Sequence, residues 1–222
     1  MDAWFRGSRR RLRFWQDFYK SPDSGRVPTE PSPFARWVGE RLAASTGPSH
    51  VLDVGTGTGR DAAHLAGLGH TVTAMDFVGK GFARTRKERA GHPVRYQGLN
   101  LEDVRSVLTT GARLAHEPGT KQVYARGMID TLGPSGRDSL WRLASMVQRR
   151  GGETFVEFRT PRSRREPKFF GSHQRTYLQP ERAVAEVEAR GGRVVHQETG
   201  RDLAPLGSEN PHICRLVVRW TS

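Results

Sequence analysis

The chain has 222 residues and a hydrophobic fraction of 35%, which is enough to fill the core of one domain and to exclude wholesale disorder. Its single cysteine, Cys214, excludes a disulfide framework and a cysteine-rich zinc site. The formal net charge of +13 would suit a nucleic-acid binder, but only five of the 36 basic residues are lysine. A GC-rich coding sequence produces such an arginine excess without any ligand. We therefore do not expect nucleic acid to be the partner.

The chain also lacks the patterns of membrane and secreted proteins. No apolar run approaches the roughly 20 residues that a membrane-spanning helix needs. The first residues, MDAWFRGSRRRLRFWQ, have no apolar stretch followed by a small-residue cleavage site, as a secretory signal would. We therefore expect a cytoplasmic protein without a membrane span.

The N-terminal part of the chain is rich in aromatic residues. Residues 4–20 place several of them on one face of a predicted helix, namely Phe14, Trp15, Phe18 and Tyr19. A proline-punctuated connector follows, and then a second predicted helix that contains Trp37. We predict that residues 1–48 form a helical cap on a domain at 49–222, with Tyr19 and Trp37 over the ligand cleft.

From residue 50 onward, short β-branched segments alternate with helical segments. Strands are predicted at 50–54, 71–75, 94–97, 122–125, 154–158, 193–196 and 214–220. Helices are predicted at 61–68 and 180–190, and helical or irregular stretches near 79–90, 101–108 and 136–149. This alternation is typical of an α/β, doubly wound, Rossmann-like sheet. The last two of the seven strands are joined without a crossover helix, so we expect the last strand to be antiparallel.

The most informative segment is VLDVGTGTGRDAAHL, residues 51–65. An apolar strand leads to Asp53, and glycines then alternate at Gly55, Gly57 and Gly59 before a helix begins. Glycine lets the backbone turn sharply there and approach a ligand closely. Further on, Asp76 ends the strand TVTAMD, where a carboxylate is well placed to accept both hydroxyls of a ribose.

The spacing D-x-G-x-G-x-G differs from the G-x-G-x-x-G of dinucleotide enzymes, which hold a pyrophosphate at a helix N-terminus. It resembles the first motif of class I S-adenosyl-L-methionine-dependent methyltransferases, and Arg60-Asp61 looks like their tellurite-resistance and thiopurine branch. The resemblance covers roughly residues 50–220 and implies S-adenosyl-L-methionine as the cofactor. By position, it implies cofactor contacts from Asp53, Gly55, Thr56, Gly57, Gly59, Arg60, Asp76, Phe77, Asn100, Leu101 and Arg126.

Structural explanations stay open for several of these residues. Asp53 could hold the backbone of its own loop, and Asp61 could cap its helix through a side-chain oxygen. Asn100 could form a turn. Among the later residues, Glu157 could pair with Arg159 and act as a structural partner only.

Candidate residues for the acceptor chemistry follow the later strands, where open α/β sheets bind ligands. In FFGSHQRTYL, three side chains alternate at period two and point the same way if the segment is extended. They are His173, Arg175 and Tyr177. We predict catalytic roles for His173, Glu157 and Asp130, with His173 as the candidate general base. We predict substrate contacts from Arg159, Arg175, Tyr177, Tyr19 and Trp37.

The resemblance implies transfer of a methyl group to an oxygen or nitrogen atom, without a metal. Five side chains would make the acceptor pocket rich in hydrogen-bond donors, namely Arg126, Arg159, His173, Arg175 and Tyr177. Arginine binds planar oxyanions through a bidentate fork, so we expect an anionic acceptor. The pattern EFRT followed by G-x-H-x-R-x-Y looks like methyltransferases of bacterial surface-glycan and secondary-metabolite pathways. We therefore expect a small-molecule or glycan-linked acceptor. Those relatives often carry a histidine after the fourth strand, where this chain has Asp130.

Two alternatives stay open. An RNA methyltransferase or basic RNA-binding relative would use the arginine clusters at 6–13 and 159–175 for phosphate contacts. The chain lacks the asparagine-proline-proline-tyrosine segment that base-amino methyltransferases often show. A non-catalytic protein that binds S-adenosyl-L-methionine would share the glycine loop.

Overall fold

The structure, a computed structural model, describes residues 2–44, 47–79, 93–165 and 175–220, with side chains from residue 10 onward. It contains one seven-stranded sheet in the order β3-β2-β1-β4-β5-β7-β6. β1 to β5 pair in parallel, whereas β7 is antiparallel to both β5 and β6. The strands are His50–Val54 (β1), Thr71–Asp76 (β2), Val94–Gly98 (β3), Lys121–Arg126 (β4), Thr154–Arg159 (β5), Gly192–Gly200 (β6) and Ile213–Trp220 (β7). The predicted doubly wound, seven-stranded sheet with an antiparallel last strand is confirmed.

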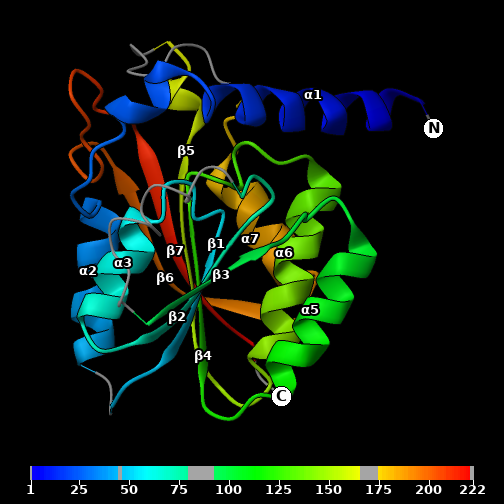
Figure 1. Cartoon of the computed structure of the whole chain (residues 1–222), viewed down its shortest axis with the longest axis vertical. Helices are drawn as coiled ribbons and strands as arrows, with labels where there is room; N and C mark the ends of the chain where they lie inside the picture. Colours follow the sequence, from blue (N-terminus) through cyan, green and yellow to red (C-terminus); the bar gives the residue numbers. More distant parts are fainter. Residues whose placement is uncertain (1, 45–46, 80–92, 166–174, 221–222) are drawn as a thin grey trace.

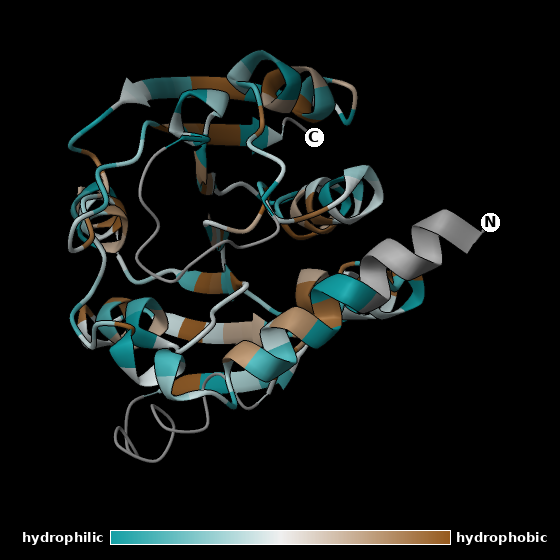
Figure 2. Ribbon diagram, turned by 90° about the horizontal axis from the view of Figure 1, so that it is seen from above, coloured by the Kyte–Doolittle hydropathy of each residue, from teal (hydrophilic) through white to brown (hydrophobic). Residues whose placement is uncertain are grey.

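Helices cover both faces of this sheet. α2 and α3 lie on one face and α5, α6 and α7 on the other, whereas α1 lies across one end of the strands (Figure 1). Seen from above, α1 runs diagonally over part of the molecule (Figure 2). The described helices are Asp2–Phe18 (α1), Pro33–Ala43 (α2), Arg60–Gly67 (α3), Val104–His116 (α5), Pro134–Val147 (α6) and Pro180–Glu188 (α7). None of these helices is long and apolar enough to cross a lipid bilayer.

Two of the stretches predicted as helical or irregular lie between β2 and β4. The one at 79–90 lies, from residue 80 onward, outside the described residues. The one at 101–108 is helical from Val104, because the Asp103 carboxylate accepts from the Arg105 and Ser106 amides and caps the helix there.

The parallel register brings two key segments together. β1 and β2 pair with Asp53 beside Ala74 and Val54 beside Met75. The glycine loop after β1 and Asp76 at the end of β2 therefore emerge at the same edge of the sheet. Apolar side chains of the strands are buried on both faces, which fixes this edge as a rigid platform.

The predicted cap at residues 1–48 splits into two parts. α1 lies over the strand ends, but α2 packs into the core on one face of the sheet, where Phe34 is fully buried. Trp37 of α2 lies against Phe155 of β5, with ring centroids 6.3 Å apart, and 5.5 Å from the ring of His196. The prediction that Trp37 lies over the ligand cleft is therefore wrong, because the apolar face of α2 covers the sheet instead.

Candidate active site

A cavity of about 430 Å³ opens at the carboxyl edge of the parallel strands, under α1. Small-molecule sites in proteins have volumes of roughly 300–1,000 Å³, so a metabolite fits this space. We call one wall the glycine-loop half; it is formed within residues 53–61, 76–77 and 99–102. We call the other wall the arginine half; it is formed within residues 126–132, 157–159, 175 and 204–213.

Glycine shapes the loop after β1. Gly55, Gly57 and Gly59 have φ values of 78°, 57° and 79°, in the left-handed region that favours glycine. The Gly55 amide donates to the Met75 carbonyl at 2.8 Å, which ties the loop to β2. A Cβ on Gly57 would lie 2.7 Å from the Tyr19 hydroxyl oxygen. A side chain at this position would therefore be both strained and obstructed.

Asp76 ends β2 directly beside this loop. Its Oδ2 accepts from the Gly57 amide at 3.0 Å, and its Oδ1 accepts from the Val78 amide at 2.9 Å. Burial raises the pKa of this carboxyl, and the backbone hydrogen bonds oppose the shift. A carboxylate offers about four lone-pair positions. Asp76 therefore keeps acceptor capacity toward the cavity that it lines.

Asp53 is buried at the end of β1 and braces the loop. It accepts a hydrogen bond from the Thr56 hydroxyl at 2.6 Å. Burial raises the pKa of the Asp53 carboxyl to about 8. Asp53 therefore braces the glycine loop by binding the Thr56 hydroxyl, and not by binding backbone amides of the loop.

The far end of the glycine-loop half is formed by Phe77, Asn100 and Leu101. Leu101 is buried, whereas the Phe77 side chain is partly exposed, so both offer apolar surface at the cavity. Asn100 Oδ1 accepts from the Glu102 amide at 3.0 Å, so this side chain also forms a turn.

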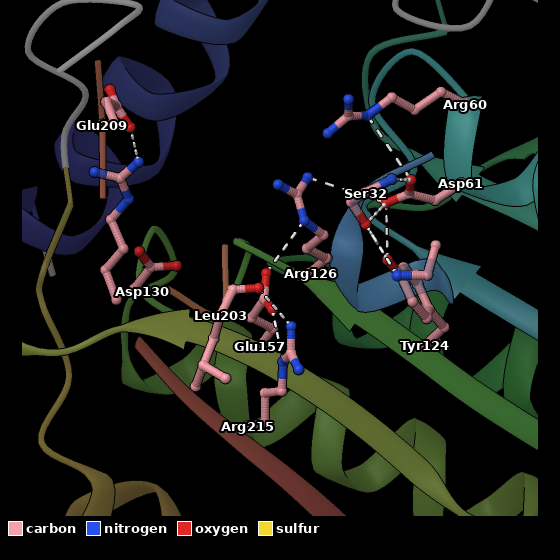
Figure 3. Close-up of polar contacts among 12 residues, drawn as sticks. Ser32, Arg60, Asp61, Tyr124, Arg126, Asp130, Glu157, Leu203, Glu209 and Arg215 are labelled. Carbon is pink, nitrogen blue, oxygen red and sulfur yellow. Dashed lines mark hydrogen bonds and ion pairs between the residues drawn. The ribbon is translucent and has the colours of Figure 1, made fainter. Parts of the chain in front are cut away.

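Asp61 joins α3 to α2 and β4. Its carboxylate accepts from the Ser32 amide, the Ser32 hydroxyl and the Tyr124 hydroxyl, each at 2.8 Å (Figure 3). Burial alone would raise the pKa of Asp61, but Arg126, Arg60 and the Ser32 amide outweigh it and lower that pKa. The alternative that Asp61 merely caps its own helix is wrong, because its oxygens bind groups on other elements.

Arg126 and Glu157 lie side by side at the ends of β4 and β5. Arg126 Nε donates to Glu157 Oε1 at 3.2 Å, and Arg215 Nε donates to Glu157 Oε2 at 3.0 Å (Figure 3). Burial acts to lower the pKa of Arg126, but Asp61 and Glu157 outweigh it and raise that pKa. Glu157 thus pairs with arginines other than Arg159.

Two more ion pairs complete the arginine half. Arg159 donates to Glu209, which lies in the loop between β6 and β7. Arg175 Nη1 donates to Asp130 Oδ2 at 2.6 Å, and the Thr176 amide donates to the Asp130 carbonyl. Asp130 is fully buried and does not line the cavity. Asp130 therefore binds Arg175 on the side away from the cavity and joins Arg175 and Thr176 to the loop after β4.

No protein-family model and no curated protein matches this sequence, but solved structures do. A SAM-dependent methyltransferase from Anabaena variabilis aligns with a TM-score of 0.70 and 14% identity over 93% of each chain. A second structure is that of the 1,6-didemethyltoxoflavin-N1-methyltransferase from Burkholderia thailandensis, with bound 1,6-didemethyltoxoflavin and S-adenosylhomocysteine. It aligns with a TM-score of 0.64 and 20% identity over 94% of this chain and 88% of that chain. The CcbJ methyltransferase from Streptomyces caelestis aligns with a TM-score of 0.63 and 18% identity over 93% of this chain and 96% of that chain. This chain has the class I methyltransferase fold.

In this methyltransferase fold, most residues of the predicted cofactor set gather on one cavity. Gly59 is the exception, because it is the N-cap residue before α3 and does not line the wall. Arg60 lines the wall while its guanidinium also donates to two carbonyls of the connector before α2. The cavity collects Asp53, Gly55, Thr56, Gly57, Arg60, Asp76, Phe77, Asn100, Leu101 and Arg126.

The predicted acceptor residues divide differently. His173 lies outside the described residues. Tyr177 has a φ of 45°, so the backbone is not extended there, and its ring faces Arg164 rather than the cavity. The predicted alternation is therefore wrong at Tyr177. The cavity collects Tyr19, Glu157, Arg159 and Arg175.

α1 forms the roof of the cavity. Trp15, Phe18 and Tyr19 line it, and the rings of Trp15 and Tyr19 stack with centroids 6.1 Å apart. Arg11 Nη2 donates to Glu102 Oε1 at 2.8 Å, which joins α1 to the loop after β3. Burial raises the pKa of the Tyr19 hydroxyl, and the nearby charge of Asp76 adds to that shift.

The site residues that sequence reasoning missed include Met128 and Glu209, which line the cavity, and Arg215, which lies behind it on Glu157. Met128 and Glu209 stand in loops that carry no motif. Arg215 carried a signal, because an arginine inside the apolar strand β7 needs a buried partner. That partner is Glu157.

Proposed function

We propose that this protein is an S-adenosyl-L-methionine-dependent methyltransferase that acts on a small molecule. The observation that carries the proposal is the left-handed glycine loop beside Asp76, on a cavity of metabolite size, in a chain with the class I methyltransferase fold. The toxoflavin enzyme of that fold is solved with S-adenosylhomocysteine bound.

The glycine-loop half fits such a cofactor. Gly55 and Gly57 let the backbone approach a ligand, and Asp76 has acceptor capacity for ribose hydroxyls. Phe77 and Leu101 offer apolar surface to a purine ring. We propose that the cofactor is held by Asp53, Gly55, Thr56, Gly57, Arg60, Asp76, Phe77, Asn100, Leu101 and Arg126, and that Gly59 contributes through the backbone of the loop.

When bound, S-adenosyl-L-methionine supplies an electrophilic methyl group whose leaving group is a neutral thioether. Because that leaving group needs no help, the side chains of the protein contribute mainly by positioning the reactants and excluding water. Trp15 and Phe18 of α1 cover the cavity. Arg126, held between Asp61 and Glu157, stands at the boundary between the two halves.

Transfer to a hydroxyl or a protonated amine also requires that the acceptor lose a proton. Glu157 lines the cavity, but arginines bind both of its oxygens, so we propose that it positions Arg126. Asp130 lies behind Arg175, and we propose that it positions that arginine. His173 is proposed as the general base on sequence grounds.

Two narrower expectations stay predictions. The relation to the tellurite-resistance and thiopurine branch rests on Arg60-Asp61. The glycan-linked acceptor rests on EFRT and the G-x-H-x-R-x-Y pattern.

Calorimetric titration with S-adenosyl-L-methionine tests the cofactor site. Asp76→Ala should weaken binding by about 1–3 kcal/mol, because the ribose hydroxyls lose a charged acceptor. The matched control is Asp138→Ala, since Asp138 pairs with Arg190 on the surface, away from the cavity. Equal affinities of wild type and Asp76→Ala would remove Asp76 from the cofactor site.

A methyl-transfer assay against a panel of metabolites, with release of S-adenosylhomocysteine as the readout, tests the reaction. RNA serves as the counter-substrate. Turnover on RNA, with an affinity that falls steeply as salt rises, would overturn the small-molecule acceptor and favour the RNA alternative.

A further inference from the structure

The charge of the arginine half differs from that of the whole chain. The chain has a formal net charge of +13. Among the described residues of this wall, however, each guanidinium has a carboxylate partner. The arginines are Arg126, Arg159 and Arg175. Their partners are Glu157, Glu209 and Asp130, respectively.

The carboxylates of these pairs are buried, and the most exposed of the arginine side chains, that of Arg126, is 26% exposed, so solvent screens the pairs little. The side chains of Arg159 and Glu209 are 13% and 4% exposed, and those of Arg175 and Asp130 are 13% and 0% exposed. A buried charge is costly unless it is paired, and here the pairing is already complete within the protein. Arg159–Glu209 and Arg175–Asp130 therefore act as nearly neutral pairs at the cavity wall. Arg126 shares Glu157 with Arg215 and also contacts Asp61, so these two arginines and two carboxylates form one charge-balanced cluster.

An anionic acceptor would have to compete with these carboxylates for the guanidiniums. It would lose its hydration and add an excess negative charge to a balanced wall. A neutral acceptor avoids both costs. The carboxylates of Glu157 and Glu209 can accept from its N–H or O–H groups, and the remaining guanidinium N–H groups can donate to its carbonyl or ring nitrogen atoms.

Much of the remaining arginine half is apolar. Beside the arginines, Glu157, Glu209 and Thr131, the side chains that line it include Met128, Leu132, Phe158, Leu206 and Ile213. Trp15 and Phe18 of α1 form the roof above it. Aromatic side chains bury large apolar areas and stack on planar ligands. A sugar would bring many hydroxyls to this surface, where apolar side chains cannot satisfy their hydrogen bonds.

We propose that the methyl acceptor is a neutral aromatic compound and not an anion or a glycan. A heteroaromatic ring with an amide or hydroxyl group at its edge is the best probe of this proposal. This inference rests on the proposed methyltransferase function. It replaces the anionic acceptor that the number of arginines predicted, because the partners of those arginines come from distant parts of the chain.

Matched pairs of ring compounds test the proposal. Quinoline-2-carboxamide and quinoline-2-carboxylate share one ring and differ in charge at neutral pH. Calorimetric titration of each into the protein saturated with S-adenosylhomocysteine should show the carboxamide binding at least about tenfold more tightly. Tighter binding of the carboxylate, or binding of neither compound while S-adenosylhomocysteine binds, would overturn the proposal.

A charge-changing variant sharpens the test. Glu209→Gln leaves Arg159 without its counter-charge, so the affinity for the carboxylate should rise by about tenfold while that for the carboxamide does not. Glu198→Gln is the matched control, because Glu198 contacts Arg215 and does not line the cavity. Asp130→Asn makes the same test at Arg175. No gain in carboxylate affinity in either variant would contradict the charge argument.

The failure of this inference and the failure of the proposed function have different signatures. S-Adenosylhomocysteine that does not bind the wild-type protein refutes the methyltransferase function. S-Adenosylhomocysteine that binds, together with a preference for the carboxylate, refutes only the neutral acceptor.

Discussion

The two halves of the cavity are built by different means. The glycine-loop half is formed by backbone geometry and by hydrogen bonds between neighbouring loops, such as the one from the Gly57 amide to Asp76. The arginine half is formed by side-chain pairs that join distant residues. Arg126 and Glu157 are 31 positions apart, and Arg159 and Glu209 are 50 apart. The first half is thus a local property of the sequence, whereas the second exists only after folding.

The largest effect is expected on stability, from a substitution where the arginine half meets the core. Glu157→Ala leaves the buried guanidiniums of Arg126 and Arg215 without their shared carboxylate. We expect the free energy of unfolding, measured in urea, to fall by about 3–5 kcal/mol. Glu153→Ala is the control, because its partner Arg219 is exposed, and it should cost less than about 1 kcal/mol. Equal losses would mean that the Glu157 pairs contribute no more than surface pairs.

In the glycine-loop half, the pH dependence of stability tests the burial of Asp53. Its pKa in the folded protein, about 8, lies above the value of roughly 3.9 for an unfolded chain. Between these values the folded state binds the extra proton, so stability falls as the pH rises, by up to about 1.4 kcal/mol per pH unit.

Asp53→Asn should remove this contribution, because the amide does not titrate. Unfolding in urea at several values between about pH 5 and pH 7 should give a flatter dependence for the variant than for wild type. Carboxyls that do not act on Asp53, such as Glu186, contribute equally to both proteins and cancel in the comparison. Parallel curves would show that Asp53 keeps an ordinary pKa.

The backbone geometry of the glycine-loop half is tested by Gly57→Ala. A left-handed residue with a Cβ costs roughly 1–2 kcal/mol, and this Cβ would also meet the Tyr19 hydroxyl. We expect the dissociation constant for S-adenosylhomocysteine to rise by roughly tenfold to a hundredfold. Gly67→Ala, at a helical position with open space, should leave it unchanged. An unaltered affinity in Gly57→Ala would mean that the glycine loop does not contact S-adenosylhomocysteine.

The fold could be predicted from the sequence because its strands carry a local signal. Strands such as β1, β2 and β7 are apolar or β-branched runs, and the glycine loop marks the turn from β1 to α3. The signal is weaker in the polar β6, which was predicted at 193–196 but spans Gly192–Gly200. The missing crossover helix between the last two strands also predicted the antiparallel β7 correctly. Helix boundaries were less exact, since the start of α5 depends on one capping side chain, Asp103.

The arginine half could not be predicted in the same way. The sequence shows the arginines at 126, 159 and 175, but their partners depend on which loops the topology brings together. Tyr177 was misplaced because one left-handed residue breaks an alternation that assumes extended backbone. Trp37 was misplaced because an aromatic face on a helix packs equally well on a sheet or over a cleft, and only tertiary contacts decide between them.

The smallest effect is expected at the roof, where Tyr19 and Trp37 make a matched pair of aromatic residues. Tyr19 lines the cavity above Gly57, so Tyr19→Leu should lower the affinity for S-adenosylhomocysteine by about fivefold, near 1 kcal/mol. Trp37→Leu should lower the stability but not this affinity, because Trp37 packs against Phe155 on the face of the sheet. Both titrations belong at a temperature where the variants stay folded. A loss of affinity in Trp37→Leu as large as that in Tyr19→Leu would mean that α2, like α1, reaches the ligand.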